Sequence, residues 1–235
     1  SSEAKLKMAI RLKLALKSPI FILTFKSLIF GLFLYLYDAN PSLIWGSLFL
    51  LISFLLYSRP LFNISSYFSL FLVLLFLSFW TGLVGGWIAN ISWWFLTVSF
   101  GVLLGLKNLV LTHRHYWHYF VSFVASYLLF LNFFLIDKSG WFWLKWLIVV
   151  VLIFLLFRDL LRPLVLASMA SLILGELLWV VSWLPIGFLS STNLAMLSLF
   201  FAVDILANQR FSWKNMGLFL ILALIILISS YWKIW

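Results

Sequence analysis

Long apolar runs alternate with short polar segments along the chain. A helix needs about 20 mostly apolar residues to cross a hydrocarbon core about 30 Å thick. Nine runs reach or approach that length, at residues 20–37, 42–57, 63–80, 88–106, 117–136, 141–157, 163–184, 188–206 and 214–232. The pattern predicts an all-α fold, a polytopic transmembrane bundle of about nine helices.

The least distinct boundary lies inside residues 63–106, a stretch too long for a single crossing. The glycine-rich segment 81–87 interrupts it, and glycine tolerates the backbone conformations of a tight turn. We therefore expect two helices here. Prolines support other boundaries, because proline suits the first turn of a helix, where its missing N–H has no partner anyway. Pro19, Pro41 and Pro163 each stand at a predicted helix start.

The distribution of positive charge predicts the orientation in the membrane, because cytoplasmic loops carry an excess of Lys and Arg. With nine helices and a cytoplasmic N-terminus, the outer side keeps only Lys138, Lys145 and Lys233. All other Lys and Arg residues then fall on or near the cytoplasmic side: Lys5, Lys7, Arg11, Lys13, Lys17, Lys26, Arg59, Lys107, Arg114, Arg158, Arg162, Arg210 and Lys214. We expect the N-terminus to be cytoplasmic and the C-terminus to lie outside.

Composition narrows the class of protein. Hydrophobic residues make up 66% of the 235 residues and charged residues only 9%, whereas a typical soluble domain is about 25% charged. A soluble enzyme is therefore excluded. No nucleic-acid partner is expected either, because the residues that give the net charge of +10 stand in short segments between apolar runs. The absence of cysteine excludes disulfides, thiolate metal sites and a cysteine nucleophile. No cofactor and no metal site are predicted.

The polar positions divide the chain into two parts. Residues 1–18 form a basic cytoplasmic segment, and residues 19–235 form a single transmembrane helical domain. We expect the basic segment to lie on anionic lipid headgroups, with docking to a partner as the alternative. The loops are too short for a soluble catalytic domain, so any function resides in the membrane or at its faces.

Glu176 is the sharpest candidate for intramembrane chemistry. It lies near the middle of the predicted helix 163–184, where an ionised carboxylate is costly unless it is paired or protonated. A stripe of small residues borders it, formed by Ser168, Ser171, Gly175 and Ser182. Because such stripes let helices pack closely, we expect Glu176 to face protein. Two interpretations stay open: a proton, cation or catalytic site, and a neutral carboxyl group hydrogen-bonded to Trp, Ser or Asn.

Lys26 lies about two turns inside the first predicted helix. Its long side chain can snorkel to the cytoplasmic headgroups, and an ion pair with Glu176 is the alternative. Asp159 and Asp204 fall at cytoplasmic helix ends. We expect Asp159 to pair with neighbouring arginines and Asp204 to pair with Arg210 or another loop arginine.

A basic, aromatic-rich segment contains all three histidines of the chain. His115 and His118 are three residues apart, which could place two imidazoles on one helix face, as a metal site requires. No Cys, Asp or Glu stands nearby to complete such a site. We instead expect contacts with lipid headgroups or phosphate. The candidates are His113, Arg114, His115, His118, Arg158 and Arg162.

Two segments resemble an uncharacterised family of polytopic membrane proteins from candidate-phyla (ultra-small) bacteria. They are Leu104-Gly105-Leu106-Lys107-Asn108-Leu109, and Gly175-Glu176-Leu177-Leu178-Trp179 running on to Leu184-Pro185-Ile186-Gly187-Phe188. The order of helices around them is similar over most of the chain. The resemblance implies a location in the bacterial cytoplasmic membrane, and it implies no particular activity.

Sparse intramembrane polarity, unbroken helices and short loops favour a non-enzymatic membrane-embedded scaffold or assembly subunit. Its expected contacts are anionic membrane lipids on the cytoplasmic face and partner membrane proteins. One alternative is a small-molecule or proton-coupled transporter that uses Glu176, which requires a polar cavity that reaches this residue. The other is a membrane enzyme acting on a lipid or polyprenyl substrate. It requires the segment 113–118 to converge with Arg158, Asp159 and Arg162 on one patch.

Overall fold

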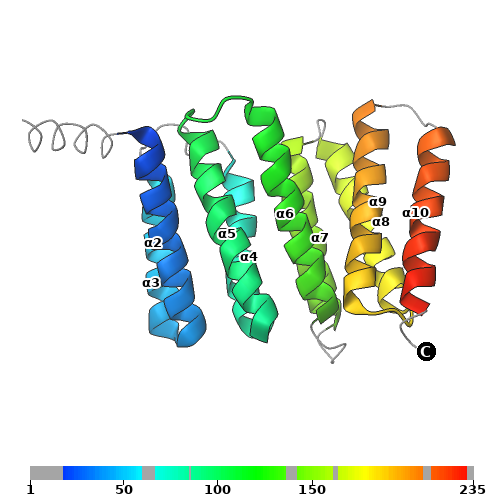
Figure 1. Ribbon diagram of the computed structural model, residues 1–235, viewed down its shortest axis with the longest axis horizontal. Helices are drawn as coiled ribbons and strands as arrows, with labels where there is room; N and C mark the ends of the chain where they lie inside the picture. The colour runs from blue at the N-terminus through cyan, green and yellow to red at the C-terminus, as the bar shows by residue number, and fades with distance from the viewer. Residues whose placement is uncertain are drawn as a thin grey trace, which may run out of the picture. The chain divides into compact units, whose positions relative to one another are not determined.

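The computed structural model describes residues 18–59, 67–84, 86–135, 142–160, 164–208 and 213–231 of the chain. These residues form nine α-helices (Figure 1). The helices are α2 (Pro19–Ala39), α3 (Leu43–Ser58), α4 (Phe68–Val84), α5 (Gly86–Lys107), α6 (Arg114–Leu135), α7 (Phe142–Leu160), α8 (Leu164–Ser182), α9 (Phe188–Asn208) and α10 (Trp213–Tyr231). The predicted all-α fold with nine helices is confirmed.

By length and composition, six of the described helices can cross a membrane: α2, α5, α6, α8, α9 and α10. The helices α3 and α4 are shorter and apolar, and α7 carries Lys145, Arg158 and Asp159 within its 19 residues. The chain is therefore an integral, multi-pass membrane protein. The orientation of its N-terminus stays a prediction.

Helix starts follow the capping residues. Ser18 caps α2 by accepting a hydrogen bond from the backbone N–H three residues on, at 3.2 Å, and Pro19 occupies the first turn, as predicted. The prediction that Pro41 starts the next helix is wrong, because Ser42 caps α3 instead. Pro163 lies outside the described residues.

The helices α4 and α5 meet at the glycine-rich segment 81–87, where the sequence predicts a turn. The first ends at Val84 and the second begins at Gly86. In contrast to the predicted run, which begins at residue 63, α4 begins at Phe68. Directly before it, Tyr67 has a φ of 62°, a left-handed conformation that an α-helix does not contain.

Contacts between helices divide the chain into two compact units, Ser1–Ser122 (unit 1) and Phe123–Trp235 (unit 2). The helix α6 runs from one unit into the other. A single domain over residues 19–235 stays a prediction. The same holds for the basic segment 1–18, of which residues 1–17 lie outside the described part of the chain.

In unit 1, α2 packs against α3 and α5, and α5 packs against α4. The helices α2 and α5 lie in front of α3 and α4 in Figure 1. Phe30 stacks on Phe100 with 4.0 Å between the ring centroids. The neighbouring Gly31 lets α5 approach closely, and its carbonyl oxygen accepts a hydrogen bond from Trp93 Nε1 at 2.6 Å.

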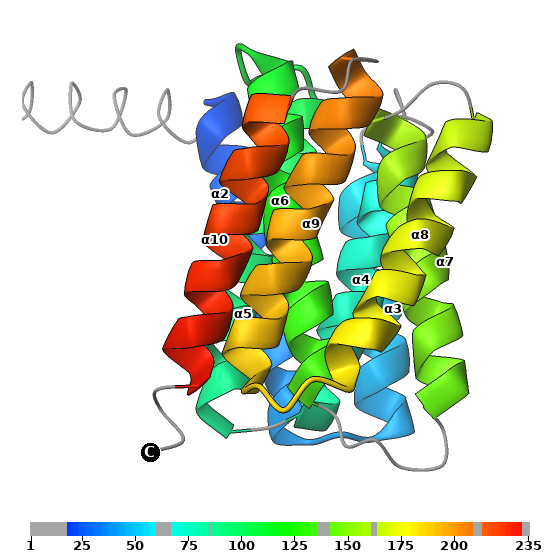
Figure 2. The same ribbon diagram turned by 90° about the vertical axis from the view of Figure 1, so that its right-hand side faces the viewer.

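In unit 2, α7 packs against α8, α8 against α9, and α9 against α10, so these helices follow chain order in space (Figure 2). At the first contact, Trp146 Nε1 donates a hydrogen bond to the carbonyl oxygen of Gly175 at 2.7 Å. At the last contact, Phe201 stacks on Phe219 with 4.8 Å between the ring centroids. Aromatic side chains therefore hold both ends of this series together.

Candidate functional site

The small-residue stripe of α8 lies against α7. Ser171, Gly175 and Ser182 are buried. A Cβ atom on Gly175 would overlap Val150 Cγ2, and the Trp146 ring lies directly beside it. Only glycine at this position leaves room for α7 to lie so close to α8. The predicted close approach of a helix to this stripe is confirmed.

Glu176 follows Gly175 directly, but its side chain leaves the buried face. Successive residues of a helix are rotated by about 100°. Glu176 is exposed, and its carboxyl group makes no hydrogen bond or ion pair with any residue that the structure describes. The expectation that Glu176 faces protein is therefore wrong for the described helices. The expected hydrogen bond to Trp, Ser or Asn is not formed among them either.

The surroundings of Glu176 on α8 are apolar. Large exposed apolar side chains share its face at helical spacing and form, with Glu176, the outward face of α8: Val165, Met169, Leu172, Ile173 and Val180. Glu176 stands six residues before Ser182, the end of α8, which corresponds to about 9 Å along the helix axis. A single carboxyl group thus interrupts an otherwise apolar surface, well inside the helix.

Lys26 is half-buried in α2 and binds the C-terminal end of α3. Its Nζ donates hydrogen bonds to the carbonyl oxygens of Leu56 at 3.4 Å and Arg59 at 2.5 Å. Carbonyl groups at a helix end have no partner within the helix, and α3 ends at Ser58. Lys26 therefore caps a neighbouring helix, a role that neither sequence interpretation includes.

Lys107 binds the same end of α3 from α5. Its side chain is only 2% exposed. Its Nζ donates to the carbonyl oxygen of Tyr57 and lies 4.5 Å from the centroid of the Tyr57 ring. Sequence reasoning counts Lys107 only as a topology determinant. Its position in the last turn of an apolar helix is the signal that could have indicated a buried ammonium group.

The histidine segment lies at the start of α6, and the described residues contain no cluster that could hold a metal ion. His115 is exposed, whereas His118 is buried, with its ring centroid 5.1 Å from that of Tyr67. The two imidazoles therefore do not share one accessible face. His113 and Arg114 are exposed, and their contact with headgroups stays a prediction.

Arg158 and Asp159 are exposed near the C-terminal end of α7 in unit 2. Arg162 lies outside the described residues. Because the segment 113–118 belongs to unit 1, neither unit by itself contains the patch that the lipid-enzyme hypothesis requires. Headgroup contact of these arginines stays a prediction.

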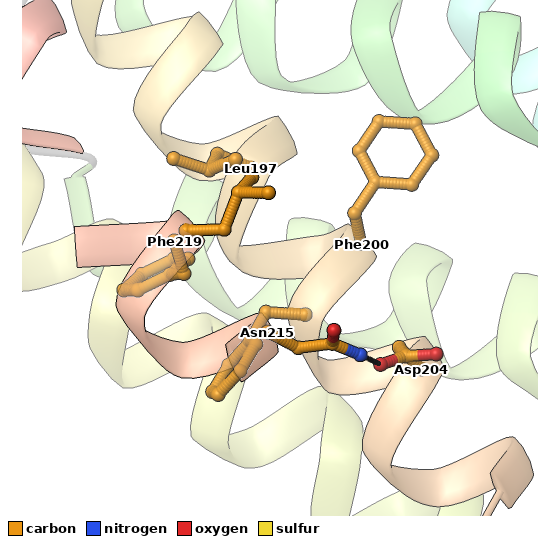
Figure 3. Close-up of a pocket in the computed structure, with 7 residues that line it drawn as sticks. Leu197, Phe200, Asp204, Asn215 and Phe219 are labelled. Carbon is orange, nitrogen blue, oxygen red and sulfur yellow. Dashed lines mark hydrogen bonds between the residues drawn. The ribbon is translucent and has the colours of Figure 1, made fainter. Parts of the chain in front are cut away.

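Asp204 on α9 pairs with Asn215 on α10 beside a small pocket (Figure 3). Asn215 Nδ2 donates a hydrogen bond to Asp204 Oδ2 at 2.5 Å. The pocket has a volume of about 170 Å³, and Phe200 and Phe219 are among its apolar lining residues. The expected partner Arg210 lies outside the described residues. Sequence reasoning missed Asn215, although an amide in the first turn of an apolar helix is typical of an interhelical hydrogen bond.

Comparison of the chain with known protein families, with curated proteins and with solved structures finds no match in any of the three. The resemblance to a family of candidate-phyla bacteria therefore stays a prediction. The structure supports a polytopic helical membrane protein with two unusual polar features: the outward face of α8 with Glu176, and the end of α3 bound by Lys26 and Lys107.

Proposed function

We propose that the protein is a non-enzymatic assembly subunit of a membrane complex, and that the outward face of α8 binds a transmembrane helix of a partner protein. The supporting observation is the exposed position of Glu176. Its carboxyl group is exposed on a helix that can cross a membrane, among apolar side chains, without a partner in the described residues.

The cost of this arrangement in lipid indicates the chemistry of the partner. An ionised side chain at the centre of a membrane helix costs about 2.5–3.5 kcal/mol, and the cost falls toward the helix end. A partner helix that brings a Lys or Arg to the depth of Glu176 removes much of this cost, because intramembrane charges are tolerated when they are paired. The proposed partner segment is therefore apolar with one basic residue.

The two alternative functions have less support. A transporter needs a polar cavity at Glu176, but this residue lines neither the pocket between α9 and α10 nor an apolar groove between α3 and α4. A lipid-modifying enzyme needs its basic residues in one patch, and each unit, taken by itself, contains only part of this set.

Energy transfer in phosphatidylcholine vesicles tests the proposal. The first labelled component is the purified protein, which carries its label at a single cysteine introduced by Leu189→Cys, since the chain has no cysteine of its own. The other is a labelled leucine-rich transmembrane peptide with one central lysine. We expect more energy transfer with this peptide than with an all-leucine peptide. Equal transfer with both peptides would refute the proposal.

Two variants provide matched controls. Glu176→Gln removes the charge and keeps the shape, so transfer with the lysine peptide should fall to the all-leucine level. Combining Glu176→Gln with Val180→Glu moves the carboxyl group one turn along the same face, by about 6 Å. This double variant should prefer a peptide whose lysine is displaced by one turn. If it binds both lysine peptides equally, general apolar adhesion explains the binding and the proposal fails.

We also propose that the membrane is the bacterial cytoplasmic membrane, with the N-terminus inside. Charge asymmetry supports this orientation. In the described part of unit 1, all Lys and Arg residues stand at one end, where α2 begins and α3 and α5 end: Lys26, Arg59, Lys107 and Arg114. A C-terminal alkaline phosphatase fusion should be active in a bacterial host. A C-terminal fluorescent-protein fusion that is bright while the phosphatase fusion is silent would contradict this orientation.

A further inference from the structure

An apolar groove of about 590 Å³ runs between α3 and α4 in unit 1. Leu51 and Leu55 line it from α3, and Phe68 and Phe71 line it from α4. Its lining is apolar except for Ser47. From Ser47 to Leu55 the groove extends about 12 Å along the axis of α3.

The groove leads toward Arg59. Leu51, Leu55 and Arg59 follow one another at four-residue spacing, so they lie along one line of α3 and its C-cap. Arg59 is exposed. Its guanidinium group makes no hydrogen bond or ion pair with any described residue. A cation with several free N–H donors therefore stands beyond the end of the groove.

Positive charge at this end of unit 1 is not balanced by described acidic residues. Lys26 and Lys107 both bind carbonyl oxygens at the end of α3. That helix end contributes only about half of a negative charge. In the described part of unit 1 the acidic residue is Asp38, and it lies near the other end of α2. The excess positive charge favours an anion from outside the chain.

A ring stack connects the basic end to the groove. Tyr57 stacks on Phe71 with 4.2 Å between the centroids and an interplanar angle of 8°. Lys107 Nζ lies over the Tyr57 ring. Because Phe71 also lines the groove, this buried stack holds α4 against the end of α3 and keeps the groove beside the basic residues.

We propose that the groove and Arg59 form a binding site for one anionic phospholipid, with the phosphate group on Arg59 and an acyl chain in the groove. From Ser47 to Arg59 the site extends about 18 Å. One leaflet of hydrocarbon is about 15 Å thick, so the site accommodates a chain and reaches the headgroup level. Guanidinium groups bind phosphate oxygens in a bidentate manner. The site lies in unit 1 and is independent of the proposed function at Glu176.

Native mass spectrometry of the full-length protein with equal amounts of phosphatidylglycerol and phosphatidylcholine tests the headgroup. We expect the wild type to retain phosphatidylglycerol in preference. Arg59→Gln should lower its retention by about tenfold or more, because a charge-assisted hydrogen bond is lost. Lys214→Gln, at the exposed start of α10, should leave retention unchanged. Equal retention of both lipids by the wild type, or equal losses in both variants, would overturn the proposal.

Filling the groove tests the acyl chain independently of the headgroup. Leu51→Trp should lower lipid retention, whereas Leu224→Trp on α10 should not, although both leucines are exposed (60% and 58%). Addition of excess inorganic phosphate distinguishes a lipid site from a phosphate-ion site. A lipid held by the groove should remain bound. Displacement by phosphate, or no effect of Leu51→Trp, would overturn the assignment to a lipid. Circular dichroism and size-exclusion chromatography verify that each variant is folded.

Discussion

Gly175 sets the distance between α7 and α8, so its replacement tests the packing of unit 2. A Cβ atom there would overlap Val150 Cγ2 and lie 3.5 Å from Trp146 Nε1. Gly175→Ala therefore forces α7 away from α8 or displaces the side chain of Val150. A separation of the helices also lengthens the 2.7 Å hydrogen bond from Trp146 Nε1 to the carbonyl oxygen of Gly175.

Three effects determine the magnitude. Overpacking of a well-packed site costs about 1–3 kcal/mol, and loss of an interhelical hydrogen bond in a membrane protein costs about 0.6 kcal/mol. The better helix propensity of alanine offsets about 1 kcal/mol of this loss. We expect Gly175→Ala to lower the free energy of unfolding by about 0.5–2.5 kcal/mol.

Titration of the micelle-bound protein with SDS, followed by circular dichroism, measures this free energy. Gly217→Ala on α10 is the matched control, because a Cβ atom at Gly217 meets nothing within 4 Å. That variant should be as stable as the wild type or slightly more stable. Trp146→Phe removes the hydrogen bond together with part of the ring that packs beside Gly175 and Trp179, so it should cost more than the about 0.6 kcal/mol of the hydrogen bond. If Gly175→Ala unfolds at the same SDS fraction as Gly217→Ala, the close approach of α7 and α8 is refuted.

Two further predictions concern unit 1 and use the same titration. Lys107→Met keeps most of the side-chain volume but removes the charged donor from the end of α3, and should cost about 1.5–3 kcal/mol. Lys214→Met at the exposed start of α10 should change little, and equal effects of the two variants would contradict the capping role. Gly31→Ala places a Cβ atom 2.6 Å from Thr97 Oγ1 and should cost about 1–3 kcal/mol. Gly217→Ala, inside α10 where a Cβ atom meets nothing within 4 Å, should cause no such loss, and comparable losses at both glycines would disprove the tight contact.

Hydropathy predicts the helices closely because membrane crossing is a local property of the chain. The runs 188–206 and 214–232 correspond to α9 (Phe188–Asn208) and α10 (Trp213–Tyr231) within two residues at each end. The larger difference at the start of α4 has a backbone cause. The positive φ of Tyr67 is not visible in the hydropathy of the run 63–80, although Asn63, Ser65 and Ser66 already make its first residues more polar than the rest.

The direction of the Glu176 side chain could not be predicted from the small-residue stripe alone. A residue beside a stripe is rotated by about 100° from its neighbour, so adjacency does not distinguish a buried from an exposed position. The buried face of α8 also includes Ala167 and Ala170. These alanines move the centre of the buried face away from Glu176, and with them the register places the carboxyl group outside.

The partners of Lys26 and Lys107 are hidden from the sequence for a different reason. Both ammonium groups bind backbone carbonyl oxygens at the end of α3. Every helix end offers such oxygens, so no complementary side chain marks the partner. Only the tertiary packing of α2 and α5 within unit 1 brings these lysines to the end of α3.

Gly31 and Gly175 show how each unit holds its helices together. The carbonyl oxygen of each glycine accepts a hydrogen bond from a tryptophan indole N–H on a neighbouring helix. Trp93 Nε1 lies 2.6 Å from the Gly31 oxygen, and Trp146 Nε1 lies 2.7 Å from the Gly175 oxygen. In lipid the hydrophobic effect does not drive helices together, so close packing and hydrogen bonds must do so. Neither the Glu176 carboxyl group nor the Arg59 guanidinium group makes a hydrogen bond or an ion pair with a described residue. We propose that each of these two groups binds a molecule from outside the chain. Because one is a carboxyl group and the other a guanidinium group, the proposed ligands carry opposite charges.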